Sequence, residues 1–480
     1  MPPSRLKRLG YDDLAILERE DDLGGTWHVN RYPGLAVDIP SSTYSYSFEP
    51  NPHWSRLFAP GSELKAYAVH VADKYDLRRH MRFDTVVQGA RWDEESSTWV
   101  VTLEGGETVA GRFLLTATGF LSQPKAARHR GHRGLRGHGR AHHPLGRRHR
   151  VWRASGSASS APARRPCRLI PEAGQGGRPP DRLPAHTDLR QPEDGRQGAR
   201  RRARRVREGA ADPEGHPPGR YVDPRAPHGR RSAALPRPPG GQPDRQAGVR
   251  GAPQAPGEGP RAAGEASWPD YDFGCKRPTF SNTYFPTFTK DHVDLETTTI
   301  SHVDANGIVT EDGRRADLDV LVLATGFNLW DTNFPAIEII GREGRDLGKW
   351  WRETRFSAYE GIAVPKFPNF FSLNSPYSYS GLSYFTTIET QMAHMDRLLK
   401  AMNKKGSSIF EVTEEANTEF LDRMTGLLGN SVFNAGQCST ARSYYFNQHG
   451  EAVLLRPTST LSAHREAVSF PLEDYAFSNA

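Results

Sequence analysis

The chain has 480 residues, of which 36% are hydrophobic and 10% aromatic, enough apolar material for two or three folded domains. The formal net charge is +7, but the excess arginine is concentrated between residues 126 and 266, which argues against an evenly basic, nucleic-acid-binding surface. The longest apolar runs have only the length of strands, which argues against a membrane span.

Cysteine content and the N-terminal sequence both bear on the cellular compartment. The three cysteines (Cys167, Cys275 and Cys438) form no CxxC pair, so we expect a reducing environment and no disulfide framework. The opening "MPPSRLKRLGYDDL" has no apolar segment of the kind found in signal peptides. These observations predict a cytoplasmic protein.

The first predicted element is a short apolar strand from Leu14 to Leu17, followed by Glu18. An acidic residue at the end of the second strand of a Rossmann unit accepts hydrogen bonds from ribose hydroxyls. Gly24 and Gly25 then allow the backbone to pass close to a ligand, although a lone Gly-Gly pair is more often a plain turn.

Two similar apolar runs end in Ala-Thr-Gly-Phe. "FLLTATGF" covers residues 113–120 and "VLVLATGF" covers residues 320–327, and each predicts a buried parallel strand. The stretches before them, "GGETVAGRF" and "DANGIVTEDGRRADLD", predict the turns of small antiparallel β-meanders.

Between residues 126 and 266 the composition changes to Arg, Gly, Pro and Ala, without Lys, Phe, Met or Asn. Such a segment cannot bury enough apolar surface to offset its ordering entropy, which predicts disorder. One explanation is a basic linker. The other is a GC-rich gene read in the wrong frame, because these four residues share GC-rich codons.

The genetic code allows a test of the second explanation. Residues 126–146, read from the second base of each codon, allow a text containing F-x-G-x-x-x-H-T-x-x-W. Residues 159–167, read from the third base, allow V-I-G-T-G-A-T-A-V, a strand entering the dinucleotide-binding turn GxGxxA. Two such motifs in order favour the shifted frame.

The remaining sequence is typical of a folded enzyme. Ile388, Met392, Met395, Leu399 and Met402 recur at helical spacing, which indicates core packing in preference to a substrate pocket. Tyr444 and Tyr445 could form an aromatic pocket wall, but core packing is again the simpler interpretation.

The string "LGGTW", followed by "RYPG" and an Asp four residues later, resembles the FAD-binding segment of the type I Baeyer–Villiger monooxygenases, which are class B flavoprotein monooxygenases. The motif in the second reading frame is similar to the fingerprint of that family. "DYDFGCKRPTFSNTYFPTF" resembles the family loop that carries a Lys-Arg pair, although most such dipeptides are solvated surface pairs. "FFSLNSPYSYSG" resembles the return of the chain to the flavin, with Ser375-Pro376 where Gly-Pro is common.

The resemblance implies roles for particular residues. Arg277 would stabilise the negative charge of a peroxyflavin, Asp38 would position Arg277, and Lys276 would contact NADPH. The implied catalytic residues are Arg277 and Asp38. The implied cofactor-binding residues are Glu18, Gly24, Gly25, Thr26, Trp27, Asp38, Tyr44, Val87, Lys276 and Arg277. No metal site is expected.

The resemblance covers roughly residues 5–125 and 267–480 and implies an α/β flavoprotein with two dinucleotide-binding, Rossmann-like domains. The expected parts are an FAD domain (1–120) without its first strand and GxGxxG turn, an NADP domain (121–327), and the rest of the FAD and substrate domain (328–480). Because pyrophosphate binding depends on backbone N–H groups at that turn, we expect the chain as written to bind FAD poorly.

The predicted activity is an FAD- and NADPH-dependent monooxygenation, in which O₂ converts a ketone to an ester or oxidises a heteroatom. No nucleic-acid partner and no membrane are expected. Two alternatives remain open at this point: an arginine-rich nucleic-acid-binding protein on a redox scaffold, and an inactive remnant of the enzyme.

Overall fold

The computed structural model describes residues 6, 9–123, 150–153, 271–277, 279–290, 293–304, 306–318, 320–324, 326–327, 329–380, 383–435, 438, 441 and 443–480. Within these ranges the α-helices are α2 (Thr26–Val29), α3 (Gly61–Lys74), α7 (Tyr284–Thr287), α8 (Leu347–Glu353), α9 (Tyr384–Lys405), α10 (Glu414–Leu428), α11 (Val432–Ala435) and α12 (Thr460–Ser469). Among the described residues, no helix has both the length and the apolar character needed to cross a bilayer.

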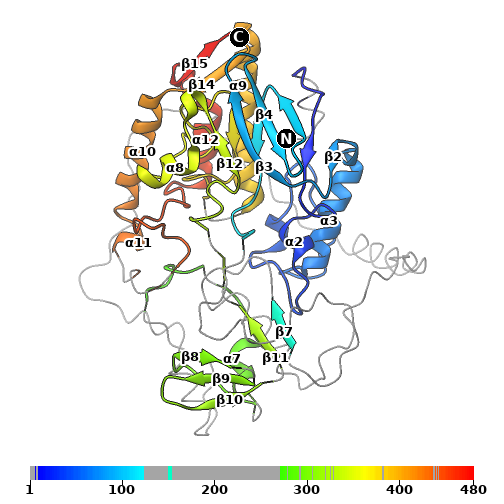
Figure 1. Cartoon of the computed structure of the whole chain (residues 1–480), viewed down its shortest axis with the longest axis vertical. Helices are drawn as coiled ribbons and strands as arrows, with labels where there is room; N and C mark the ends of the chain where they lie inside the picture. The colour runs from blue at the N-terminus through cyan, green and yellow to red at the C-terminus, as the bar shows by residue number, and fades with distance from the viewer. Residues whose placement is uncertain are drawn as a thin grey trace, which may run out of the picture. The chain divides into compact units, whose positions relative to one another are not determined.

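A four-stranded sheet has the order β12-β3-β4-β5, which Figure 1 shows in part. Its strands are β3 (Val87–Asp93), β4 (Thr98–Leu103), β5 (Thr108–Gly111) and β12 (Glu338–Ile340). β4 alternates between partly and fully buried residues, so one face of the strand packs on the core. Trp92 and Trp99 face each other across β3 and β4, with ring centroids 5.7 Å apart. The predicted meander at residues 105–113 is confirmed by the β4–β5 pairing.

The other predicted meander is also confirmed. β8 (Ile300–Val303), β9 (Gly307–Thr310) and β10 (Arg315–Asp317) form an antiparallel three-stranded sheet in the order β10-β9-β8. Gly307 is required here, because a Cβ at this position would lie 2.0 Å from the carbonyl oxygen of Ala316.

Parallel pairing joins segments that are distant in the sequence. β1 (Ile16–Leu17) pairs with β2 (Met81–Arg82), and β6 (Leu114–Thr116) pairs with β13 (Phe370–Ser372). β11 (Val320–Leu323) pairs with β7 (Arg150–Arg153). Parallel strands are typical of α/β proteins, in which ligands bind near the carboxyl ends of the strands.

β7 lies inside the arginine-rich stretch for which disorder was predicted. That prediction is wrong for residues 150–153, which contain the strand-forming residues Val151 and Trp152 and pair along β11. The rest of residues 126–266, including the proposed basic linker and the frame-shifted motifs, lies outside the described residues.

The main core includes α9, α10, α12 and the antiparallel pair formed by β14 (Ile409–Val412) and β15 (Tyr475–Ser478). α9 and α12 pack together, as Figure 1 also shows. Met395, Leu399 and Met402 are buried in this core and Ile388 and Met392 are half-buried, so the prediction that this stripe packs in the core is confirmed. α9 ends at Gly406, which adopts φ 65° and allows the chain to leave the helix.

The expectation of a chain without disulfides is wrong. Cys275 and Cys438 form a disulfide with a Cα–Cα distance of 5.0 Å, although they are 163 residues apart in the sequence. Both cysteines are buried, and they pack against Tyr271, Val432 and Phe446. The count and spacing of cysteines carry no information about which segments meet in the folded chain, so the sequence did not reveal this pair.

Candidate functional site

The Gly24–Gly25 turn leads directly into α2. Gly24 has φ 117° and Gly25 has φ 49°, and both values favour glycine. A Cβ on Gly24 would lie 2.8 Å from Cδ of Lys65. The Lys65 ammonium donates to Asp22 Oδ2 at 2.7 Å and to the carbonyl of Leu23. The turn is therefore held against α3. Backbone conformation favours glycine at both positions, and at Gly24 the nearby Lys65 side chain also leaves little space for a Cβ.

Glu18 follows β1 directly, as the sequence predicted. Its backbone N–H donates to the carbonyl of Arg82 at 3.0 Å, which extends the parallel pairing with β2. Its carboxylate Oε1 accepts a hydrogen bond from the backbone N–H of Glu20 at 3.0 Å. A carboxylate held by its own turn has a defined position at the end of the strand, which suits recognition of a ribose hydroxyl.

Trp27 and Tyr44 form an aromatic cluster with Phe385 of α9. Trp27 Nε1 donates to the hydroxyl of Tyr44 at 3.2 Å, and the two rings meet edge to face with centroids 5.8 Å apart. The rings of Tyr44 and Phe385 are also edge to face, at 4.9 Å. Thr26 is the first residue of α2, and its carbonyl accepts from Asn30. The structure thus brings two of the sequence-predicted residues into direct contact.

Arg277 is buried between two partners from different parts of the chain. Its Nε donates to Asp38 Oδ2 at 3.4 Å, and its Nη1 donates to the hydroxyl of Tyr379 at 3.1 Å. The side chains of Arg277 and Asp38 are only 11% and 18% exposed. Burial lowers the pKa of Arg277, but nearby Tyr379 and Asp38 raise it, and the balance leaves the pKa above its ordinary value. A positive charge therefore persists at this buried position.

Lys276 is directed to a different neighbour. Its ammonium lies 4.4 Å from the centroid of the Tyr271 ring, a distance typical of a cation–π contact. Val87 begins β3 opposite Leu103 and packs, partly buried, against the main core. The contacts of these two residues thus differ from those of the Arg277 site.

The segment Asn374–Tyr379 carries features that the sequence did not reveal. Asn374 and Tyr377 have φ 56° and 59°, which are strained values for residues other than glycine. Among the described residues, the buried atoms Asn374 Oδ1 and Ser378 Oγ have no hydrogen-bond partner. Unsatisfied buried polar atoms concentrate at ligand sites, so Asn374 and Ser378 are the candidate ligand contacts of this segment. The only sequence signal was the similarity of this segment to the family's return to the flavin.

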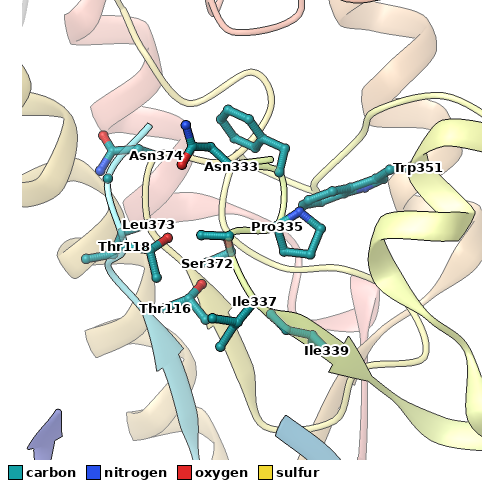
Figure 2. Close-up of a pocket in the computed structure, with 13 residues that line it drawn as sticks. Thr116, Thr118, Asn333, Pro335, Ile337, Ile339, Trp351, Ser372, Leu373 and Asn374 are labelled. Atoms are coloured by element: carbon teal, nitrogen blue, oxygen red, sulfur yellow. The ribbon is translucent and has the colours of Figure 1, made fainter. Parts of the chain in front are cut away.

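A small cavity lies at the carboxyl ends of β6 and β13 (Figure 2). Thr116, Thr118 and Gly119 line it at the end of β6 and just after it, and Ser372, Leu373 and Asn374 do so at the end of β13. Residues 333–337, Ile339 and Trp351 complete the lining. Its volume is about 20 Å³, room for about one water molecule and far too little for a flavin ring.

Tyr444 and Tyr445 are both buried, and their rings are tilted against each other with centroids 4.7 Å apart. Both belong to the main core, and both contribute to the electrostatic environment of Arg277. The core interpretation is therefore confirmed, and the same residues also form part of the surroundings of the buried cation.

Comparison with known proteins first defines the class. The family model described as "NAD(P)-binding Rossmann-like domain" matches residues 4–60, which include Glu18 and the Gly24–Gly25 turn. A "Baeyer-Villiger monooxygenase" of Streptomyces coelicolor is 30% identical over 98% of this chain and 89% of its own length. The chain belongs to the Baeyer–Villiger monooxygenase family and is by this relationship a flavoprotein monooxygenase.

Solved structures agree on the fold. "Oxidized steroid monooxygenase bound to NADP" is 24% identical, with a TM-score of 0.72 over 99% of this chain and 96% of that one. "OTEMO complex with FAD and NADP" is 23% identical, with a TM-score of 0.72 over 99% and 97%. The chain thus has the α/β, Rossmann-like fold of these enzymes.

These comparisons do not support the truncation and the shifted frame that the sequence suggested. The match to the Streptomyces protein extends over 98% of the chain, and the likeness to the solved structures over 99%. The family-based part of the prediction is confirmed, whereas the predicted loss of part of the protein is not.

Proposed function

We propose that this chain binds FAD and NADPH and uses O₂ to insert oxygen next to a ketone carbonyl or to oxidise a heteroatom. In this proposal residues 1–120 and 328–480 hold FAD, and residues 121–327 hold NADPH. Support comes from the family relationship and from the buried Asp38–Arg277–Tyr379 arrangement, which is the observation that carries the mechanism.

The described residues fit a flavin nucleotide. The Gly24–Gly25 turn presents backbone without side chains, in a conformation that glycine adopts readily. The orphaned Asn374 Oδ1 and Ser378 Oγ are buried polar atoms, and such atoms are costly unless a partner is bound. Glu18 at the end of β1 is of the right type for a ribose hydroxyl.

Bound FAD would supply the chemistry of hydride acceptance from NADPH and of O₂ activation. Arg277 contributes a permanent positive charge, because a guanidinium does not lose its proton at physiological pH. In a buried site this charge stabilises developing negative charge more than it would in water. Asp38 fixes the position of Arg277. Lys276 lies next to Arg277 in the chain, and we assign it to contact with NADPH.

In this proposal aromatic side chains limit the entry of water. Trp27, Tyr44 and Phe385 are half-buried and pack edge to face, and Trp27 Nε1 donates to the hydroxyl of Tyr44. Exclusion of water matters, because it prevents the loss of activated oxygen as hydrogen peroxide.

The experiment is a cofactor and product assay on the full chain. The purified protein is titrated with FAD, and quenching of flavin fluorescence reports binding. NADPH consumption is then followed with a cyclic ketone and, separately, with an aryl methyl sulfide, while ester, sulfoxide and hydrogen peroxide are quantified. Poor FAD binding was expected from a missing N-terminal turn, but the comparisons do not support that truncation. We therefore expect FAD binding and at least one oxygenated product. A chain that binds FAD and oxidises NADPH but releases only peroxide with every substrate would contradict the monooxygenase proposal.

A further inference from the structure

We propose that Tyr379 is a second positioning residue for Arg277: its hydroxyl holds the guanidinium at a different nitrogen atom from the one that contacts Asp38. This inference rests on the proposed function, since it assigns Tyr379 to the machinery of the same site. Tyr379 was not among the residues that the sequence resemblance implied.

Asp38 and Tyr379 contact different nitrogen atoms of Arg277. Asp38 accepts from Nε at 3.4 Å, and Tyr379 accepts from Nη1 at 3.1 Å. A planar group held at both atoms has a more closely defined orientation than the same group without the Nη1 contact. Loss of the Tyr379 hydroxyl should therefore increase the rotational freedom of the guanidinium.

Tyr379 is itself rigidly held. Its side chain is buried, and its backbone forms a parallel β-bridge with Leu455 of the neighbouring chain segment. Its carbonyl accepts from the backbone N–H of Arg456 at 2.8 Å, and its own N–H donates to Leu454 at 3.4 Å. The side chain of Arg456 is anchored in turn by Glu360 at 2.7 Å. These contacts fix the backbone of Tyr379, so they limit where its hydroxyl can lie relative to Arg277.

The chemical type of this partner also fits the role. Asp38 already supplies one negative charge close to Arg277. A second carboxylate would reverse the sign of the local charge and weaken the stabilisation of an anion. A neutral phenol accepts a hydrogen bond and orients the guanidinium without cancelling its charge.

The test compares Tyr379→Phe, which removes only the hydroxyl, with Tyr377→Phe as a matched control. Tyr377 lies two residues away in the same segment and is 1% exposed, and its charged neighbours are Glu451 and Arg355. Two quantities are measured: product formed per NADPH consumed, and the rate at which phenylglyoxal modifies Arg277 in the full chain without added flavin, followed by peptide mass spectrometry. The second readout reports the freedom of the guanidinium and requires no catalysis.

We expect Tyr379→Phe to lower the ratio of product to peroxide by about tenfold and to speed Arg277 modification by a similar factor, because one hydrogen bond to a charged group is lost. Tyr377→Phe should leave both unchanged. In an Arg277→Ala background, Tyr379→Phe should have no further effect on the product ratio, which shows that it acts through Arg277.

The outcomes separate the two proposals. If Arg277→Ala keeps the parent ratio of product to peroxide, the proposed function of the site fails. If Arg277→Ala loses that ratio while Tyr379→Phe matches Tyr377→Phe in both measurements, only the positioning role of Tyr379 is overturned. Thermal unfolding of each variant identifies any loss of fold. In folded Tyr379→Phe protein, the rate at which phenylglyoxal modifies Arg277 then shows whether Tyr379 positions the guanidinium.

Discussion

Two buried arginines in this protein have different surroundings. Arg456 is 2% exposed, and its Nη2 donates to Glu360 at 2.7 Å and to Glu466. Its guanidinium also lies 5.2 Å from the centroid of the Phe420 ring. Arg277 is 11% exposed, and its contacts to Asp38 and Tyr379 are longer, at 3.4 and 3.1 Å.

These different surroundings distinguish the structural ion pairs of Arg456 from the candidate catalytic ion pair of Arg277 with Asp38. Arg456 joins two carboxylates in the core, so its charge is fully neutralised where it sits. Arg277 contacts the carboxylate of Asp38 and the neutral hydroxyl of Tyr379, and in our proposal its charge stabilises a further negative charge. The two sites are connected, because the backbone N–H of Arg456 donates to the carbonyl of Tyr379.

The largest effect is expected for substitutions of Arg277, the candidate catalytic arginine. Arg277→Ala should lower oxygenated product per NADPH by about 100-fold or more, the loss typical of a preorganised electrostatic group. The variant leaves Asp38, whose side chain is 18% exposed, without this partner, so thermal unfolding and quenching of flavin fluorescence check that the fold and FAD binding survive. Arg277→Lys should restore little, since an ammonium lacks the planar fork. Asp38→Ala should lose most of the product with less effect on flavin reduction.

The measurement is product by gas chromatography with peroxide in parallel. If Arg277→Ala formed nearly as much oxygenated product per NADPH as the parent, Arg277 would be a structural arginine like Arg456, and the proposed difference between them would be wrong.

The second effect concerns stability. Arg456→Met should lower the free energy of unfolding by about 3–5 kcal/mol, because it leaves the buried Glu360 carboxylate without its main partner. Arg423→Met is the matched control. Arg423 contacts the same two carboxylates, but its side chain is 44% exposed, so the expected cost is below about 1 kcal/mol. Urea unfolding of both variants measures the difference, and equal costs would contradict a special role for burial.

The third prediction addresses the disulfide, which anchors the loop of Arg277. Cys438→Ser should lower the free energy of unfolding by about 2–4 kcal/mol, the usual range for a lost disulfide. Because Cys275 lies two residues before Arg277, the variant should also release more peroxide per NADPH. Cys167→Ser serves as the cysteine control. Peptide mapping without reductant checks that Cys275 and Cys438 are joined by a disulfide. Two free thiols at these positions would contradict the prediction.

The last prediction is a pH dependence near Arg456, whose effect is absent at neutral pH. Burial, and then the positive charges of Arg456 and Arg397, lower the pKa of His394 to about 3. The unfolded chain therefore binds a proton at His394 below about pH 6.5, whereas the folded chain binds it only near pH 3. The stability conferred by the neutral ring is present above pH 6.5 and declines by up to about 1.4 kcal/mol per pH unit as the pH falls.

His394→Phe should flatten this part of the profile, since the ring stacks on Phe470 at 3.9 Å and a phenyl group retains that packing. Urea unfolding between pH 7 and pH 4 tests the slope. His464→Phe, at an exposed position on α12, is the control. An unchanged slope in His394→Phe would show that another group titrates.

The amino-acid sequence by itself determined the local features of the protein. Both β-meanders, the strand before Glu18, the turn at Gly24 and Gly25 and the packed stripe on α9 were predicted, because each depends on residues within a few positions of one another. Alternation, helical spacing and the conformational freedom of glycine are short-range properties. The pairing of Asp38 with Arg277 was implied only by family resemblance.

Tertiary structure alone decided which distant residues meet. Tyr379 lies 102 residues from Arg277, Glu360 lies 96 residues from Arg456, and Cys275 lies 163 residues from Cys438. No local pattern specifies such contacts, because they arise when buried faces of separate elements pack together and bring unrelated segments within hydrogen-bonding distance. The same packing decided the electrostatic difference between the two arginines: an arginine in the sequence carries no sign of whether folding will surround it with two carboxylates or with one carboxylate and a phenol.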